Sequence, residues 1–165
     1  MTPRRNVHPY YDYRTIDSFS LSWIRIICGA RGLGKTFGAK VKGTKKALRA
    51  KLIMLNGEWN ASEQFIYVRR TLEEIQAAKR TFFSDMASFF PNHDFRVNGT
   101  AGYAARRVVR KKGEDDAAYK KRVKNRKWFI VCHFKALSVA QQEKGTSFPL
   151  VTMIMFDEFI IEKSS

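Results

Sequence analysis

Cysteines, acidic residues and long apolar runs are all scarce in this sequence. The two cysteines, Cys28 and Cys132, lie inside separate apolar runs, so they predict neither a disulfide framework nor a metal site. We therefore expect a protein of a reducing cytosol. No apolar run approaches the roughly 20 residues that span a bilayer, and the N-terminus lacks the apolar core of a signal peptide.

The scarcity of acids leaves a strongly basic chain. Thirty-one Lys and Arg residues oppose fifteen Asp and Glu residues, which gives a formal net charge of +16. Such an excess predicts an anionic partner much larger than a nucleotide. Nucleic acid is the first candidate, and an anionic membrane surface is the alternative.

A chain of 165 residues, 44% of them hydrophobic, is long enough for one α/β domain but not for two. We expect an irregular leader over residues 1–20 and one domain over residues 21–165. Alternating apolar strands and helices predict a largely parallel sheet covered on both faces. The expected strands are 23–28, 64–68, 95–97, 128–134 and 150–156, the expected helices are 35–50 and 71–90, and a loop is expected at 56–61.

A glycine-rich turn follows the first expected strand. Its sequence fits the P-loop pattern G-x-x-x-x-G-K-[ST] at every fixed position, and it stands between a strand and a helix as that motif must. Glycines allow backbone N–H groups to approach phosphate oxygens, and the helix adds its positive dipole end. The motif consists of Gly29, Ala30, Arg31, Gly32, Leu33, Gly34, Lys35 and Thr36.

This motif predicts binding of a nucleoside triphosphate, ATP with Mg²⁺ being the expected ligand. Lys35 is expected to contact the β- and γ-phosphates, and the Thr36 hydroxyl to ligate Mg²⁺. Two acids, Asp157 and Glu158, end the last apolar strand, where P-loop folds place the Walker B carboxylate. Asp157 is expected to hold the Mg²⁺ shell. Glu158 is expected to orient or deprotonate the attacking water, as in P-loop ATPases of the additional-strand, catalytic-glutamate (ASCE) type.

Three strings, at residues 27–36, 63–70 and 156–160, resemble the DNA-packaging ATPases of small, phi29-like podoviruses. Residues 137–139 and 142–144 are similar as well. The resemblance implies a three-layer ASCE fold and a homo-oligomeric ring, usually a pentamer, on the portal of an empty capsid in the host cytoplasm. It further implies ATP-driven translocation of double-stranded DNA, an ATP site at the subunit boundary, and a basic residue supplied in trans.

The chain departs from that pattern at its end. In this ATPase class a further strand with a sensor residue follows the Walker B strand, yet only seven residues follow Glu158 here. We therefore expect the N-terminal part of a longer ATPase, whose isolated activity is weak or absent. Two alternatives stay open: a helicase or partition-type ATPase, and a nucleotide-gated module that binds nucleic acid without turnover.

The charged stretch 98–127 is an insertion in this pattern, and its basic part, residues 106–127, is expected to be a loop or a solvated helix. It predicts sequence-independent contacts to DNA phosphates, with structural RNA at the portal or solvent alone as alternatives. The candidates for these contacts are Arg106, Arg107, Arg110, Lys111, Lys112, Lys120, Lys121, Arg122 and Lys124.

Other basic residues are candidates for a sensor or trans-acting role. Arg69 and Arg70 end the second strand and either sense phosphate or pair with acids across a subunit contact. Lys144, on a loop, is a weaker candidate. The helix after the P-loop also carries a basic face, interpreted as a solvated surface, which consists of Lys40, Lys42, Lys45, Lys46, Arg49 and Lys51.

Overall fold

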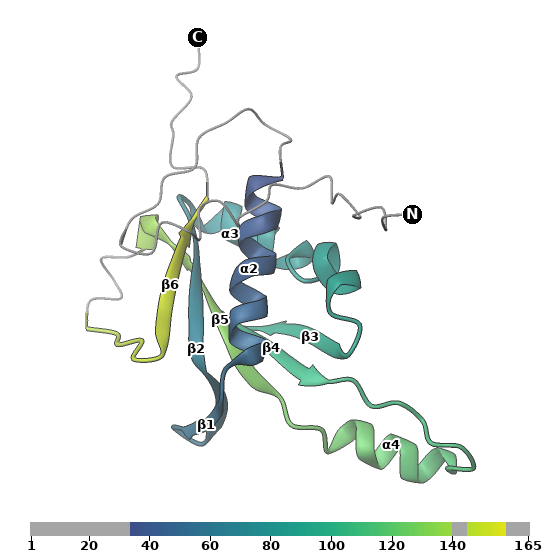
Figure 1. Ribbon diagram of the computed structural model, residues 1–165. Coiled ribbons are helices and arrows are strands. Elements are labelled where there is room, and N and C mark those ends of the chain that lie inside the picture. The colour runs from purple at the N-terminus through teal and green to yellow at the C-terminus, as the bar shows by residue number, and fades with distance from the viewer. Residues whose placement is uncertain (1–33, 140–144, 158–165) are drawn as a thin grey trace, which may run out of the picture.

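A computed structural model describes residues 34–139 and 145–157, so the expected leader and the expected strand 23–28 lie outside the described residues. Helices and strands follow one another from the P-loop lysine to the last apolar strand (Figure 1). They are α2 (Lys35–Arg49), β1 (Leu52–Leu55), β2 (Glu58–Arg69), α3 (Leu72–Thr81), the 3-10 helix η1 (Ser84–Phe89), β3 (His93–Asn98), β4 (Ala101–Arg106), α4 (Asp116–Lys124), β5 (Phe129–Ala136) and β6 (Val151–Phe156).

Strand β2 organises the sheet, because it pairs in parallel with both β5 and β6 and antiparallel with β1. The strand order β1-β2-β5-β4-β3 continues through antiparallel pairs of β4 with β5 and of β3 with β4. The expectation of a mainly parallel sheet is therefore wrong for the described strands, which form a mixed α/β sheet. Two of the three antiparallel pairs arise because two-residue turns join β1 to β2 and β3 to β4.

The expected loop at 56–61 is also wrong. Only Asn56 and Gly57 turn, with φ of 52° and 79°, and β2 begins at once with Glu58. Two consecutive positive φ values match a type I′ turn, which suits the twist of an antiparallel hairpin and favours Asn-Gly. The pair of strands therefore depends on this dipeptide.

The expected helix 71–90 is divided in the structure. Its start follows the prediction, since Thr71 and Glu74 form a capping box. The α-helix ends at Thr81, however, and η1 follows. Phe82 and Phe83 are both buried, and consecutive residues of a straight α-helix point about 100° apart. A bend at this point lets both rings reach the core.

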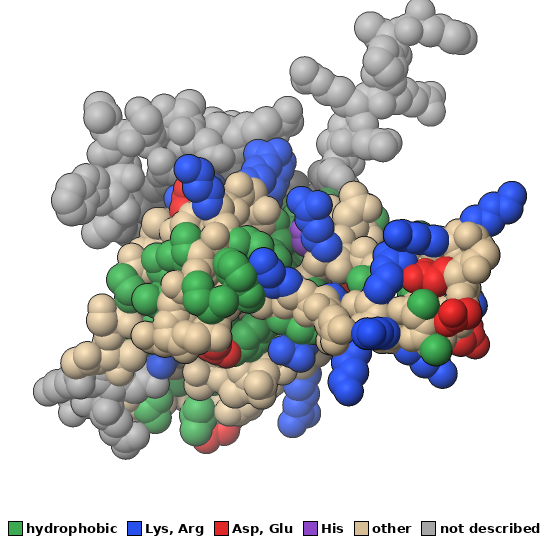
Figure 2. Space-filling view, turned by 90° about the horizontal axis from the view of Figure 1, so that it is seen from below, with side chains coloured by type: hydrophobic (Ala, Val, Ile, Leu, Met, Phe, Trp, Pro, Cys, Tyr) green, Lys and Arg blue, Asp and Glu red, His purple; other side chains and the backbone are tan. Residues whose placement is uncertain are grey.

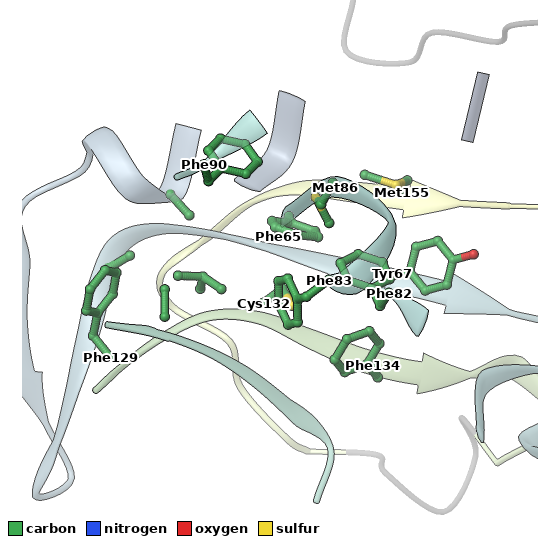
Figure 3. Close-up of a cluster of buried hydrophobic side chains, with 14 of the residues drawn as sticks. Phe65, Tyr67, Phe82, Phe83, Met86, Phe90, Phe129, Cys132, Phe134 and Met155 are labelled. Atoms are coloured by element: carbon green, nitrogen blue, oxygen red, sulfur yellow. The ribbon is translucent and has the colours of Figure 1, made fainter. Parts of the chain in front are cut away.

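One hydrophobic cluster holds the helices to the sheet (Figure 3). Phe82 packs edge-on against Tyr67 of β2 and Phe134 of β5, with ring centroids 5.0 Å apart in each case. Helices α2, α3 and η1 all contribute buried side chains to this cluster. On the face of β6 that points away from this cluster, Ile154 is 68% exposed. Among the described residues, helices therefore cover one face of the sheet and not both, as was expected.

The charged stretch 98–127 begins with a strand that the sequence does not predict. Its first part forms β4, which pairs with β5, and only the remainder leaves the sheet and carries α4. None of the helices in the described ranges is long and apolar enough to cross a membrane.

Candidate functional site

Gly34 is the last glycine of the P-loop motif and the N-cap of helix α2. Its φ of 72° is a left-handed conformation that favours glycine, and its carbonyl accepts the first helical hydrogen bond from Gly38 N–H at 2.8 Å. Lys35 and Thr36 then occupy the first turn of α2, which carries no acid. Unpaired N–H groups and the helix dipole make such an end favourable for an anion. The motif residues Gly29, Ala30, Arg31, Gly32 and Leu33 lie outside the described residues.

Asp157 lies directly after strand β6, at the carboxyl edge of the three parallel strands. Its backbone N–H donates to the Val68 carbonyl at 3.1 Å, which extends the parallel ladder between β6 and β2 by one residue. The carboxylate is thereby placed at the edge where ligands bind in open α/β sheets. Glu158, the expected catalytic acid, is outside the described residues.

The two halves of the predicted site meet through Thr36 and Asp157. The Thr36 hydroxyl donates to Asp157 Oδ1 at 2.6 Å, across 121 residues of sequence. A hydroxyl and a carboxylate supply hard oxygen atoms, the donor type that Mg²⁺ prefers. The residues present therefore fit the ion that the motif implies.

The second oxygen of Asp157 is held by two residues of β2. Arg69 lies 2.9 Å from Asp157 Oδ2, and the Tyr67 hydroxyl donates to the same oxygen at 2.7 Å. Arg69 Nε in turn donates to the Tyr67 hydroxyl oxygen at 3.0 Å. Because Tyr67 and Arg69 are two residues apart on one strand, they share a face of the sheet. The Tyr67 hydroxyl points away from the neighbouring aromatic rings (Figure 3).

Tyr67 was not expected in the site. The signal available in the sequence was its position two residues before Arg69 on an expected strand, which placed both side chains on one face. Burial is the main cause that raises the pKa of Tyr67, and the charge of Asp157 raises it further. The phenol therefore stays protonated and donates its hydrogen bond to the carboxylate.

The expectation that the basic face of α2 is solvated is wrong for Lys40, which is buried. Its Nζ lies 3.6 Å from Asp85 and 4.8 Å from the ring centroid of Phe82. Burial lowers the pKa of Lys40, while the charges of Asp85 and Asp157 partly oppose that shift. Lys40 thus links α2 to η1 beneath the candidate site, whereas Lys45, Lys46 and Arg49 are exposed.

The two candidate sensor arginines contact acids of their own chain. Arg69 pairs with Asp157, as described, and Arg70 pairs with Glu74 at 3.2 Å beside the start of α3. The latter contact belongs to the capping arrangement of α3, since Glu74 also accepts from the Arg70 backbone N–H at 3.1 Å. Lys144, the third candidate, lies outside the described residues.

The DNA-contact candidates lie on β4 and on a projecting segment that carries α4. This segment leaves the sheet far from the N-terminal end of α2 (Figure 1), so the structure does not bring it into the candidate nucleotide site. Three of the candidate arginines pair with acids: Arg107 with Asp94, Arg110 with Asp116, and Arg122 with Glu114. The other candidates are exposed and comprise Arg106, Lys111, Lys112, Lys120, Lys121 and Lys124.

Comparison with known families identifies the chain. Residues 8–111 match the model of the podovirus DNA encapsidation protein (Gp16), and this range covers more than half of the chain. The chain belongs to this family. The matched range includes the whole P-loop motif and ends at Lys111, before helix α4 begins.

Two relatives match this chain over 88% of its length. The DNA packaging protein of Bacillus phage B103 is 34% identical over 148 residues, which is 88% of this chain and 36% of the relative. The DNA packaging protein of Bacillus phage phi29 is 33% identical over 148 residues, which is 34% of its length. The chain thus spans about a third of the length of these relatives.

Solved structures agree with the fold. The N-terminal domain of the DNA packaging ATPase from bacteriophage phi29 matches 94% of this chain and 62% of that domain, with a TM-score of 0.62 and 30% identity. A chain of the phi29 viral genome packaging motor assembly matches 95% of this chain and 37% of its own length, with a TM-score of 0.63 and 30% identity. The mixed α/β fold is therefore that of the phi29 ATPase N-terminal domain.

Proposed function

We propose that this chain binds ATP with Mg²⁺ and forms the ATPase part of a motor that drives double-stranded DNA into a viral procapsid. The observation that carries the proposal is the hydrogen bond of 2.6 Å between Thr36 and Asp157. It joins the end of a P-loop motif to the acid after a parallel strand, the two positions between which P-loop ATPases hold Mg²⁺ and phosphate.

Each part of the site has a distinct role in this proposal. Backbone N–H groups of residues 29–36 and the start of α2 surround the phosphates, and Lys35 neutralises the β- and γ-phosphate charge. Thr36 and Asp157 would hold Mg²⁺, which when bound would offset the charge that develops on the phosphates. Glu158 orients the attacking water and accepts its proton. Together these roles describe an ASCE-type ATPase.

Family membership supports the step from nucleotide binding to DNA packaging. Relatives of similar sequence are DNA packaging proteins of Bacillus phages, and one structural match belongs to a viral genome packaging motor assembly. The net charge of +16 suits a polyanionic partner. We extend the proposal to a homo-oligomeric ring, a pentamer by resemblance, that acts at the procapsid portal in the host cytoplasm, with a basic residue supplied in trans.

Nucleotide binding is tested first, with the chain as it stands. Titration with a fluorescent ATP analogue and Mg²⁺ is expected to give saturable binding that Lys35→Ala reduces at least tenfold, because the P-loop lysine contacts two phosphates. Lys45→Ala is the matched control, since it removes the same charge from an exposed position of the same helix. Equal affinity of the two variants for the analogue would contradict the assignment of the P-loop.

Hydrolysis is tested in the full-length, ring-assembled protein. Glu158→Gln is expected to abolish phosphate release while ATP affinity stays within a few-fold of wild type, because only proton transfer and water orientation are lost. Unchanged turnover would remove Glu158 from the catalytic role. ATP binding without any turnover by the wild-type protein would favour a nucleotide-gated binding module.

A further inference from the structure

A basic arm, residues 107–128, leaves the sheet between β4 and β5. Its helix α4 projects away from the strands and from α2 (Figure 1), and none of the α4 residues is buried. An isolated helix of nine residues is marginal in water. The arm therefore needs contacts other than an apolar core to keep its shape.

Arginines supply those contacts within the arm. Arg122 donates to both carboxylate oxygens of Glu114, at 2.7 and 2.8 Å. Arg110 pairs with Asp116 and donates to the Glu114 carbonyl at 3.0 Å. These bonds connect α4 to residues 107–115, the outgoing limb of the arm. Residues 125–128 form its returning limb. A guanidinium is suited to this work, because it presents several donors in a fixed plane.

Arginines also fix the root of the arm, where its two limbs meet the sheet. Arg107 from the outgoing limb and Arg126 from the returning limb both pair with Asp94 of β3. The guanidinium groups of Arg126 and Arg96 each lie 4.3 Å from the ring centroid of Trp128. The Asp94 carboxylate thus restrains both limbs and the Trp128 indole restrains the returning limb, so the arm leaves the sheet in a defined direction.

The lysines of α4 lie on the other side of the helix. At about 100° per residue, Lys120, Lys121 and Lys124 fall within about 100° of the circumference, and all three are exposed. Tyr119 and Arg122 lie on the opposite side, where the Tyr119 hydroxyl donates to the Val108 carbonyl of the limb. In the part of the chain that the structure describes, no acid forms an ion pair with the three lysines.

The space-filling view shows the result at the surface. Basic side chains gather over the projecting arm, with the few acids between them (Figure 2). Lys111 and Lys112, at the turn before α4, are exposed and extend the set. Apart from Lys127, whose Nζ lies 3.5 Å from the ring centroid of Trp59, the arm therefore divides its basic residues into paired arginines and lysines that face solvent.

The composition of α4 indicates which polyanion, a membrane surface or a nucleic acid, it is suited to contact. Helices that lie on membranes carry an apolar face. Helix α4 has only Tyr119 and Val123 as large apolar side chains, and Tyr119 is turned toward the limb. Flexible lysine ammonium groups act as point charges and lack the fixed planar fork with which arginine recognises its acceptors. This surface suits sequence-independent contact with nucleic-acid phosphates.

We propose that the basic arm contacts the phosphate backbone of duplex DNA through Lys111, Lys112, Lys120, Lys121 and Lys124, and that its arginines hold the arm in place. The identity of the duplex as DNA rests on the proposed packaging function. Of the nine candidates that the sequence offers, Arg107, Arg110 and Arg122 thereby become structural residues. The contact is independent of sequence, as translocation along a genome requires.

The test measures binding of the full chain to a random 30-base-pair DNA duplex between about 50 and 200 mM salt. Changing Lys120, Lys121 and Lys124 together to Gln is expected to weaken binding about tenfold at 0.1 M salt and to lower the log–log salt slope by about 2 to 3. The matched control changes Lys45, Lys51 and Lys79 to Gln, which removes the same charge outside the arm. This control is expected to keep the wild-type slope.

Two results would overturn the proposal. Equal salt slopes for the arm variant and its control would mean that positive charge spread over the whole surface, rather than the arm, binds the duplex. Tighter binding of a double-stranded RNA of equal length, lost in the arm variant, would make RNA the partner. Far-UV circular dichroism confirms that each variant folds. The arm variant is also expected to keep its affinity for Mg²⁺–ATP, so failure of nucleotide binding and failure of the arm are separate outcomes.

Discussion

Arg69 and Asp157 form an ion pair of 2.9 Å at the carboxyl edge of the sheet, through the carboxylate oxygen that Thr36 does not use. Both side chains are largely buried, at 19% and 14% exposure. One oxygen of Asp157 therefore faces the P-loop, while the other is bound to β2 through Arg69 and Tyr67. The Asp157 carboxylate therefore has a structural role in addition to its proposed role toward Mg²⁺.

We expect Asp157→Ala to lower the free energy of unfolding without nucleotide by about 1–3 kcal/mol, because Arg69, Tyr67 and Thr36 lose their shared acceptor. Urea denaturation measures this change. Glu73→Ala, at an exposed site in the first turn of α3, is the control and is expected to cost no more than about 0.5 kcal/mol. Equal stability of the two variants would show that the network around Asp157 contributes nothing to the fold.

A second prediction concerns the close packing of β4 on the core. A Cβ atom at Gly102 would lie 2.5 Å from Cys132 Sγ and 2.8 Å from the ring of Phe83. Gly102→Ala is therefore expected to destabilise the fold by about 1–3 kcal/mol, since overpacking forces neighbours to shift. Gly43→Ala is the comparison, because its closest neighbour at 2.9 Å is the flexible end of Met153. Thermal unfolding is expected to show a smaller loss for Gly43→Ala than for Gly102→Ala.

The sequence predicted those features that depend on local pattern. The capping box of Thr71 and Glu74 is present, and the expected strands 64–68, 128–134 and 150–156 coincide with parts of β2, β5 and β6, although β5 and β6 each begin one residue later than expected. These segments have apolar runs or fixed capping chemistry, which a reader of the sequence can recognise. Asp157 likewise lies at the end of a strand, as predicted. The prediction was possible because ligand-binding residues of open α/β sheets follow the carboxyl ends of apolar strands.

Features that depend on distant partners were not predicted. Strand β4 reads Ala-Gly-Tyr-Ala-Ala-Arg, mostly residues of low strand propensity, and it forms by pairing with β3 and β5. At Gly102, Cys132 and Phe83 leave no space for a Cβ atom. Asp94 had no visible role, since its partners Arg107 and Arg126 are 13 and 32 residues away. The hairpin at Asn56 differs from these cases, because its Asn-Gly turn is visible in the local sequence. The expectation there was nevertheless a loop over residues 56–61.

Stability is expected to depend on pH through His133. Burial, with a smaller effect of the Lys135 charge, lowers the pKa of His133 to about 4, from an ordinary value near 6.5. Between these values the unfolded chain takes up a proton that the folded chain does not. The free energy of unfolding is therefore expected to fall as pH drops from about 6.5 to 4, by up to about 3 kcal/mol from this group.

Urea denaturation at pH 7, 6, 5 and 4.5 checks this dependence. His133→Gln is expected to flatten the curve, because glutamine keeps a polar group near Gln64 but takes up no proton. Some dependence remains in the variant, since burial and the nearby charge of Arg106 also lower the pKa of His93. Identical pH profiles for wild type and variant would contradict the assignment to His133.

The root of the basic arm gives the last prediction. Asp94→Ala removes the acceptor shared by Arg107 and Arg126, so both limbs lose their ion pair with β3. We expect trypsin to cleave within residues 107–127 several-fold faster than in wild type, because local opening of the arm then costs less free energy. Mass spectrometry of timed digests locates the cuts, and Glu73→Ala is expected to leave their rate unchanged. Unaltered cleavage of Asp94→Ala would mean that the stacking on Trp128 alone restrains the arm.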